Sequence, residues 1–120
     1  MVAGRERLRI LIKDHGFMLP MATAILSILW PDAFTVYDVR VCSELSGFDN
    51  LDNVGSFDKK WERYCEYCDA VRAAVPHKES LRDKDRYLWA RNAIRQLNED
   101  IETGFHRARP TKSSLLRRGT

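Results

Sequence analysis

Residues 19–41, LPMATAILSILWPDAFTVYDVRV, form the stretch that decides the fold. The stretch begins as an almost wholly apolar segment that suits a buried helix, with Pro20 in the first turn, where its missing N–H costs nothing. Pro31 lies just beyond the expected end of this helix. Thr35 is then expected to cap a second helix, with Asp38 in its first turn. The stretch therefore predicts two consecutive helices joined by a short turn.

Further helices are expected on both sides of this stretch. Gly16 follows a segment with helical apolar spacing and suits a left-handed C-cap. Ser56 and Ser80 are N-cap residues, and Pro76 separates the two helices that they start. The loop 48–55 is rich in Asp, Asn and Gly. In all we expect helices over 5–15, 20–30, 35–45, 56–75 and 80–104.

The fold class follows from what these patterns contain and lack. No strand-like alternation of useful length is present, and no heptad is sustained along the chain. We therefore predict an all-α fold, a compact bundle of about five helices without a sheet. Residues 1–105 are expected to form this single helical domain, because 120 residues are enough for one core.

Composition indicates a soluble globular protein, with 44% hydrophobic and 31% charged residues. The longest apolar run, residues 17–30, is shorter than the roughly 20 residues that a membrane-spanning helix needs. The basic N-terminus is not followed by a signal-peptide pattern. We therefore expect a cytoplasmic protein that does not associate with a membrane.

The C-terminal segment 106–120 is basic and carries no acidic residue. We expect it to be a flexible tail. Its positive side chains can contact phosphates through counterion release, which makes them candidate nucleic-acid-binding residues, although a charged terminus without any partner is the alternative. These residues are Arg107, Arg109, Lys112, Arg117 and Arg118.

The three cysteines, Cys42, Cys65 and Cys68, admit two interpretations. The spacing of Cys65 and Cys68 is that of a zinc half-site. However, both lie on the apolar stripe of the helix over 56–75, where free cysteines act as small core residues. We therefore expect neither a metal site nor a cofactor, and keep a zinc module as the weakest of three function classes.

The order of an apolar helix, a turn and Asp38, eighteen positions after Pro20, resembles the catalytic segment of the helix-hairpin-helix DNA glycosylases. Two further blocks are similar to divergent bacterial relatives of that family, which have no activity to transfer. They are Tyr64-x-x-Tyr67 and Leu81-Arg82-x-x-Asp85-Arg86-x-Leu88-Trp89. The resemblance implies DNA binding, a role in base excision and so in DNA repair, and a catalytic carboxylate at Asp38.

The chain departs from the family pattern in two places. The family's hairpin reads Leu-Pro-Gly-x-Gly, whereas residues 15–20 read HGFMLP and supply only one glycine. Pro20 occupies the position at which bifunctional members carry a Schiff-base lysine, which excludes lyase chemistry through a lysine there. The resemblance therefore implies at most a monofunctional N-glycosylase-like hydrolase.

Asp38 has two roles that the sequence leaves open. It can complete a capping box with Thr35, or it can stabilise a cationic sugar and activate water for base removal. Arg40 and Asp85 form a candidate supporting ion pair, because a carboxylate in the stripe of the last helix needs a partner. The alternative function is a non-catalytic helical protein that oligomerises or binds another subunit through an exposed apolar face.

Overall fold

Five α-helices and two short helical turns form the part of the chain that this computed structural model describes, residues 2–78 and 80–104. The α-helices are α1 (Val2–Arg9), α2 (Leu19–Leu29), α3 (Val39–Glu44), α4 (Phe57–Ala74) and α5 (Leu81–Gly104). A π-helical turn at Ile10–Asp14 continues α1, and a 3-10 turn at Leu51–Asn53 precedes α4. No strand occurs in these residues, which confirms the all-α prediction.

Three helix ends lie where the sequence signals place them. Gly16 follows the π-helical turn with φ of 74°, in the left-handed region that favours glycine. The Ser56 side chain accepts a hydrogen bond from the N–H of Lys59 at 3.2 Å and caps α4. The Ser80 side chain accepts one from the N–H of Asp83 at 3.0 Å and caps α5. Local side-chain and backbone chemistry is therefore enough to position these ends.

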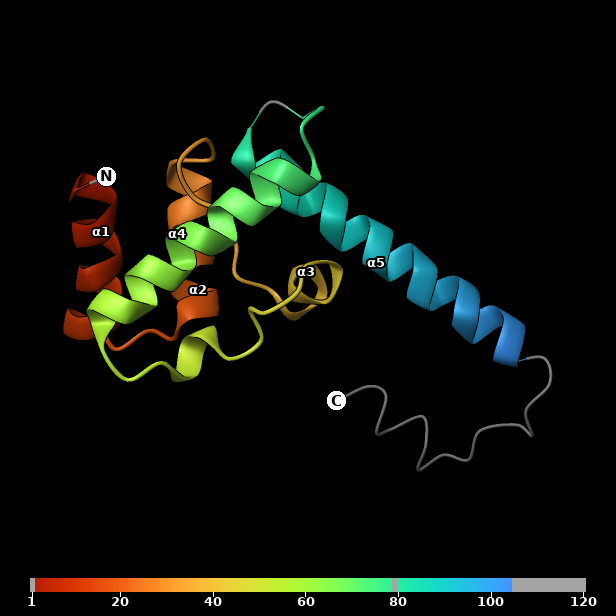
Figure 1. The fold of residues 1–120 in the computed structure, drawn as a ribbon, viewed down its shortest axis with the longest axis horizontal. Coiled ribbons are helices and arrows are strands. Elements are labelled where there is room, and N and C mark those ends of the chain that lie inside the picture. The colour runs from red at the N-terminus through yellow and green to blue at the C-terminus, as the bar shows by residue number, and fades with distance from the viewer. Residues whose placement is uncertain (1, 79, 105–120) are drawn as a thin grey trace.

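Helix α4 crosses the other helices and organises the core (Figure 1). Its first part contacts α1, its last part contacts α5, and Tyr64 and Tyr67 in its middle are buried. Their rings stack at a centroid distance of 6.1 Å. Apolar side chains from every α-helix complete the core, among them Leu8, Leu19, Leu26, Val41, Val71 and Leu88.

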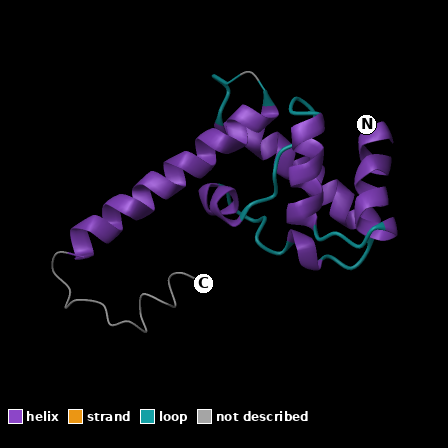
Figure 2. Cartoon of the chain, turned by 180° about the vertical axis from the view of Figure 1, so that it is seen from behind, coloured by secondary structure: helices purple, strands orange, loops and turns teal. Residues whose placement is uncertain are grey.

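Helix α5 is packed over its first half only. Leu81 and Leu88 are buried, whereas the second half of the helix extends away from α1, α2 and α4 (Figures 1 and 2). The apolar residues of that half, Ile94, Leu97 and Ile101, are exposed. The compact part of the molecule therefore consists of α1 to α4 and the first turns of α5.

The expected helix over residues 35–45 is shorter than predicted. Helix α3 begins at Val39 and ends at Glu44, and the residues before it are extended. The side chain of Thr35 is buried and bonded to Asp85, so it does not cap a helix. The contacts of this extended segment form the centre of the candidate site.

Candidate functional site

Two tyrosines of α4 fix the backbone of the extended segment 35–38. The Tyr64 hydroxyl donates to the carbonyl of Thr35 at 2.6 Å and accepts from the N–H of the same residue at 3.0 Å. The Tyr67 hydroxyl donates to the carbonyl of Val36 at 2.9 Å. Burial raises the pKa of both hydroxyls above the ordinary value, so they remain protonated donors. These hydrogen bonds therefore satisfy backbone groups of Thr35 and Val36 that a helix would otherwise have to pair.

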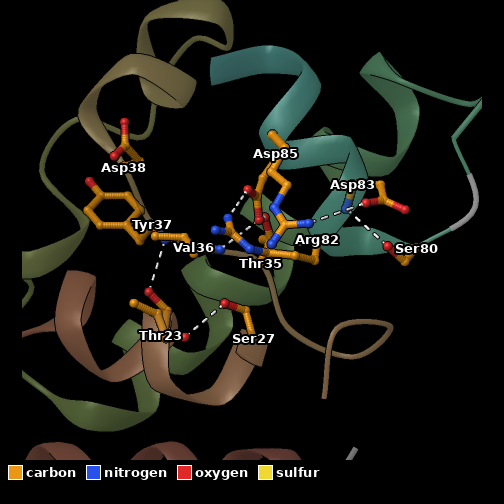
Figure 3. Close-up of polar contacts among 12 residues, drawn as sticks. Thr23, Ser27, Thr35, Val36, Tyr37, Asp38, Ser80, Arg82, Asp83 and Asp85 are labelled. Atoms are coloured by element: carbon orange, nitrogen blue, oxygen red, sulfur yellow. Dashed lines mark hydrogen bonds and ion pairs between the residues drawn. The ribbon is translucent and has the colours of Figure 1, made fainter. Parts of the chain in front are cut away.

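Asp85 of α5 holds the same segment from the other side (Figure 3). Its side chain is 2% exposed. Oδ2 accepts from the Thr35 hydroxyl at 2.7 Å and from the N–H of Val36 at 3.0 Å, and Oδ1 pairs with Arg82 one turn earlier. Burial raises the pKa of this carboxyl, while the hydrogen bonds and Arg82 act in the opposite direction. Asp85 is thus a structural carboxylate whose partners are all within the protein.

The predicted ion pair between Arg40 and Asp85 is wrong. Arg82 takes the place of Arg40 beside the carboxylate, because it lies three residues before Asp85 on the same helix. The Arg40 guanidinium instead donates to Oδ1 of Asn92 at 3.0 Å and lies 5.4 Å from the centroid of the Trp89 ring. Arg40 therefore contacts a later turn of α5.

Asp38 is the N-cap of α3. Its backbone is extended, with φ of −133° and ψ of 140°, and its Oδ1 accepts from the N–H of Arg40 at 2.7 Å. The capping box with Thr35 is therefore wrong, because Asp38 itself precedes the first helical residue. The neighbouring Tyr37 N–H donates to the Thr23 hydroxyl of α2 at 2.9 Å, which adds a third helix to the anchors of this segment (Figure 3).

An open cavity of about 310 Å³ borders Asp38. Trp89 and Arg86 contribute an aromatic ring and a positive charge from α5. Arg82 adds an Nε that is buried and has no hydrogen-bond partner. The full lining comprises Ala24, Val36, Asp38, Val41, Arg82, Asp85, Arg86 and Trp89. Such a volume is at the lower end of the range of small-ligand sites.

A loop carboxylate occupies a backbone amide at the start of α2. The N–H of Leu19, the first residue of α2, donates to Oδ1 of Asp52 at 3.0 Å. Lys60 lies 3.8 Å from the same carboxylate oxygen. Asp52 was not recognised in the sequence, because it lies in the loop and reaches a helix 33 residues away. Asp52 thus ties the loop to the N-terminus of α2.

The cysteines lie in or beside the core. Cys68 is buried as expected, whereas Cys65, also expected in the core, is partly exposed, and Cys42 is buried as well. Burial raises the pKa of Cys68 to about 12 and that of Cys42 to about 11, so both thiols are protonated at neutral pH. Within residues 2–78 and 80–104, no group of three or more potential metal ligands is found.

The predicted nucleic-acid contacts of the C-terminal tail fall outside the described residues. Arg107, Arg109, Lys112, Arg117 and Arg118 all belong to this segment. Their role stays a prediction.

Glu44, at the end of α3, ties α5 to the compact part of the molecule. Its side chain is 1% exposed. The carboxylate accepts from Nε of Arg91 at 2.7 Å, from Nη2 of Arg95 at 2.6 Å and from Nδ2 of Asn92 at 3.1 Å. Burial raises the pKa of Glu44, but these hydrogen bonds outweigh burial and lower it to about 2. The sequence alone gave no sign of this cluster.

Helix α5 carries a second apolar face on the side opposite to these contacts. We call it the outer stripe. Ile94, Leu97 and Ile101 are 59%, 58% and 50% exposed, and Tyr87 is 37% exposed. Residues recur at spacings of three and four, which places them on one line along a helix. The outer stripe consists of Tyr87, Ala90, Ile94, Leu97, Ile101 and Gly104.

No family model, curated protein or solved structure matches this chain. In the described part of the chain, no helix is both long enough and apolar enough to cross a membrane.

Proposed function

We propose that this chain is a non-catalytic helical oligomerisation protein whose copies bind one another through the outer stripe of α5. One observation carries the proposal. Helix α5 has two apolar faces, and the compact part of the molecule covers only the one that carries Leu81 and Leu88. The other face holds three large aliphatic side chains that are at least half exposed.

The physical reason is the cost of leaving such a face in water. Single exposed apolar residues are ordinary, but a continuous line of them on one helix face is typical of an interface. An isolated helix in water also gains most of its stability from packing rather than from intrinsic propensity. A second helix laid on the outer stripe removes the apolar surface from water and supports the projecting half of α5 at the same time.

Sedimentation velocity over a wide range of protein concentration tests the proposal. The full chain is expected to dimerise, and Leu97→Glu is expected to remain monomeric because it places a charge in the middle of the stripe. Gln96→Glu is the matched control, since it adds the same charge at the adjacent position, away from the stripe. A wild-type chain that is monomeric throughout would refute the proposal, as would equal dimerisation by both variants.

We propose, as a second candidate, a base-excision activity at Asp38 on nucleic acid. Support comes from the position of Asp38 on an open cavity beside Trp89 and two arginines. Trp89 offers a ring on which a base flipped out of a DNA duplex can stack, and Arg86 offers positive charge to the phosphates of that nucleotide. The carboxylate would stabilise the cationic sugar as the base leaves, and water would complete the hydrolysis.

Release of free base from single-stranded and mismatched DNA tests this second candidate. Asp38→Asn is the informative variant, because asparagine caps a helix as well as aspartate and the fold is retained. Asp32→Asn, an exposed carboxylate outside the cavity, is the control. Base release by wild type and by Asp32→Asn but not by Asp38→Asn is the expected result. Equal release by all three proteins, or by none, would exclude the activity at Asp38.

A further inference from the structure

We infer that two copies of this chain pair antiparallel along α5, in the register that sets Ile94 of one copy against Leu97 of the other. This inference rests on the oligomerisation proposed above and adds the orientation and register of the partner. It follows from the spacing, the residue sizes and the charges of the outer stripe.

The spacing of the stripe is that of a coiled-coil seam. Its residues follow one another at intervals of 3, 4, 3, 4 and 3 from Tyr87 to Gly104. An average interval of 3.5 residues keeps a line of side chains facing one partner helix along its whole length. A helix is therefore the kind of partner that fits this face.

Residue size selects the antiparallel orientation. With Ile94 opposite Leu97, Ala90 lies opposite Ile101 and Tyr87 lies opposite Gly104, so every residue of the stripe has a partner. Each small residue then faces a large one, and the layers have similar volume, as close packing requires. A parallel pair in register would instead place two tyrosines together at one end and two glycines at the other.

The charges along α5 select the same orientation. Five basic and two acidic side chains occupy residues 82–95, whereas residues 96–104 carry the acidic Glu99, Asp100 and Glu102 and no basic residue. Antiparallel pairing brings the acidic last turns of one copy level with the basic middle turns of the other, whose Arg91 also bonds to Glu44 of its own chain. Parallel pairing would place the acidic ends side by side. Each such contact is weak at a surface, but together they discriminate between orientations.

The fold leaves room for this arrangement. Helix α5 uses opposite sides for the compact part of the molecule and for the outer stripe, because Leu88 and Asn92 project away from the line through Ile94 and Leu97. Figures 1 and 2 show the second half of the helix clear of α1, α2 and α4. The compact part of each copy thus lies mainly on the far side of its own α5 from the shared seam, and His77 packs on the Tyr87 end of the stripe.

Cross-linking between two single-cysteine additions tests orientation and register together. Ala90→Cys and Ile101→Cys chains, distinguished by a size tag on one, are mixed and treated with a short bis-maleimide. Linked peptides are then identified by mass. A cross-link between Cys at position 90 of one copy and Cys at position 101 of the other, a 90-to-101 link, is expected in the mixture. Ala90→Cys alone should give no 90-to-90 link, since eleven residues of helix separate the two sites by roughly 16 Å in the antiparallel pair.

The controls separate the possible failures. Wild type under the same conditions reports reaction of the native cysteines, above all the partly exposed Cys65. Sedimentation of each variant shows whether it still dimerises. A 90-to-90 link, or dimers without a 90-to-101 link, would overturn the antiparallel register while leaving oligomerisation intact. Absence of dimers in the wild-type chain would overturn the proposed function itself.

Discussion

Replacing Glu44 by glutamine is expected to loosen the attachment of α5 to α3. The carboxylate is 1% exposed and accepts hydrogen bonds from Arg91, Asn92 and Arg95, all of them on α5. Glutamine keeps one acceptor oxygen but replaces the other by an amide donor that faces the guanidinium groups. The variant therefore loses the negative charge and at least one of the hydrogen bonds.

The size of the effect follows from the pKa of Glu44. Its fall from 4.5 to about 2 corresponds to a ceiling of about 3.4 kcal/mol, at about 1.36 kcal/mol for each pKa unit. The side chains of Arg91 and Arg95 are 45% and 53% exposed, so water screens the interaction. We therefore expect Glu44→Gln to lower the free energy of unfolding by about 1–2 kcal/mol at pH 7, which lowers the Tm by roughly 5–10 °C.

The difference in unfolding free energy between wild type and Glu44→Gln is expected to shrink as the pH falls. A carboxyl whose pKa is depressed in the folded state stabilises that state at pH values above its unfolded pKa. This stabilisation is lost as the pH falls toward the folded pKa. For Glu44 the loss therefore begins below about pH 4.5 and continues to about pH 2. The difference in unfolding free energy between wild type and Glu44→Gln should be constant near neutral pH, shrink as the pH falls below about 4.5 and close near pH 2.

Urea unfolding followed by circular dichroism at several pH values measures this gap. Glu62→Gln provides the control, because Glu62 is an exposed carboxylate on α4. Equal stability of Glu44→Gln and Glu62→Gln at pH 7 would refute the reasoning. So would a gap that stays the same between neutral and acidic pH, since it would not come from the ionised carboxylate.

Three further substitutions test the anchoring of the extended segment, each by urea unfolding. Asp85→Ala is expected to lower the free energy of unfolding by about 3 kcal/mol, because it leaves Arg82 and the polar groups of residues 35–36 unpaired. Arg40→Ala should lower it by less than about 1 kcal/mol. Equal losses in the two variants would support an Arg40–Asp85 ion pair after all. Tyr64→Phe should lower the free energy of unfolding by about 1–3 kcal/mol, because it removes two buried hydrogen bonds. An unchanged urea midpoint would show that these hydrogen bonds do not stabilise the fold. Asp38→Ala should cost about 1 kcal/mol and Asp38→Asn much less, so a similar loss in both would exclude capping as the structural role.

Sequence reasoning located those elements whose signals are local. The caps at Ser56 and Ser80 and the positive φ of Gly16 each depend on residues within one helical turn, so the sequence contains the whole cause. The start of α3 depends on distant partners. Tyr64 and Asp85 bind Thr35 from 29 and 50 residues away, and no local pattern reveals that these contacts outweigh helix formation.

The outer stripe was accessible from the sequence but was not recognised. Its six positions span only two and a half heptads, fewer than the three or four that distinguish a coiled coil from chance. Leu88 and Ile94 are both apolar residues of this helix, but they point to different sides of α5. Only the structure shows that the first is buried and the second is 59% exposed.

The two proposed surfaces meet at Arg86. This residue lines the cavity beside Asp38, and it lies one turn before Trp89 of the cavity and Ala90 of the outer stripe. Trp89→Ala should therefore affect the cavity alone, and Leu97→Glu the pairing of copies alone. Because Arg86 borders both surfaces, Arg86→Ala should weaken each of them if both are used. If Arg86→Ala loses only base release or only dimerisation, the Arg86 side chain contributes to the corresponding surface and the other surface functions without it.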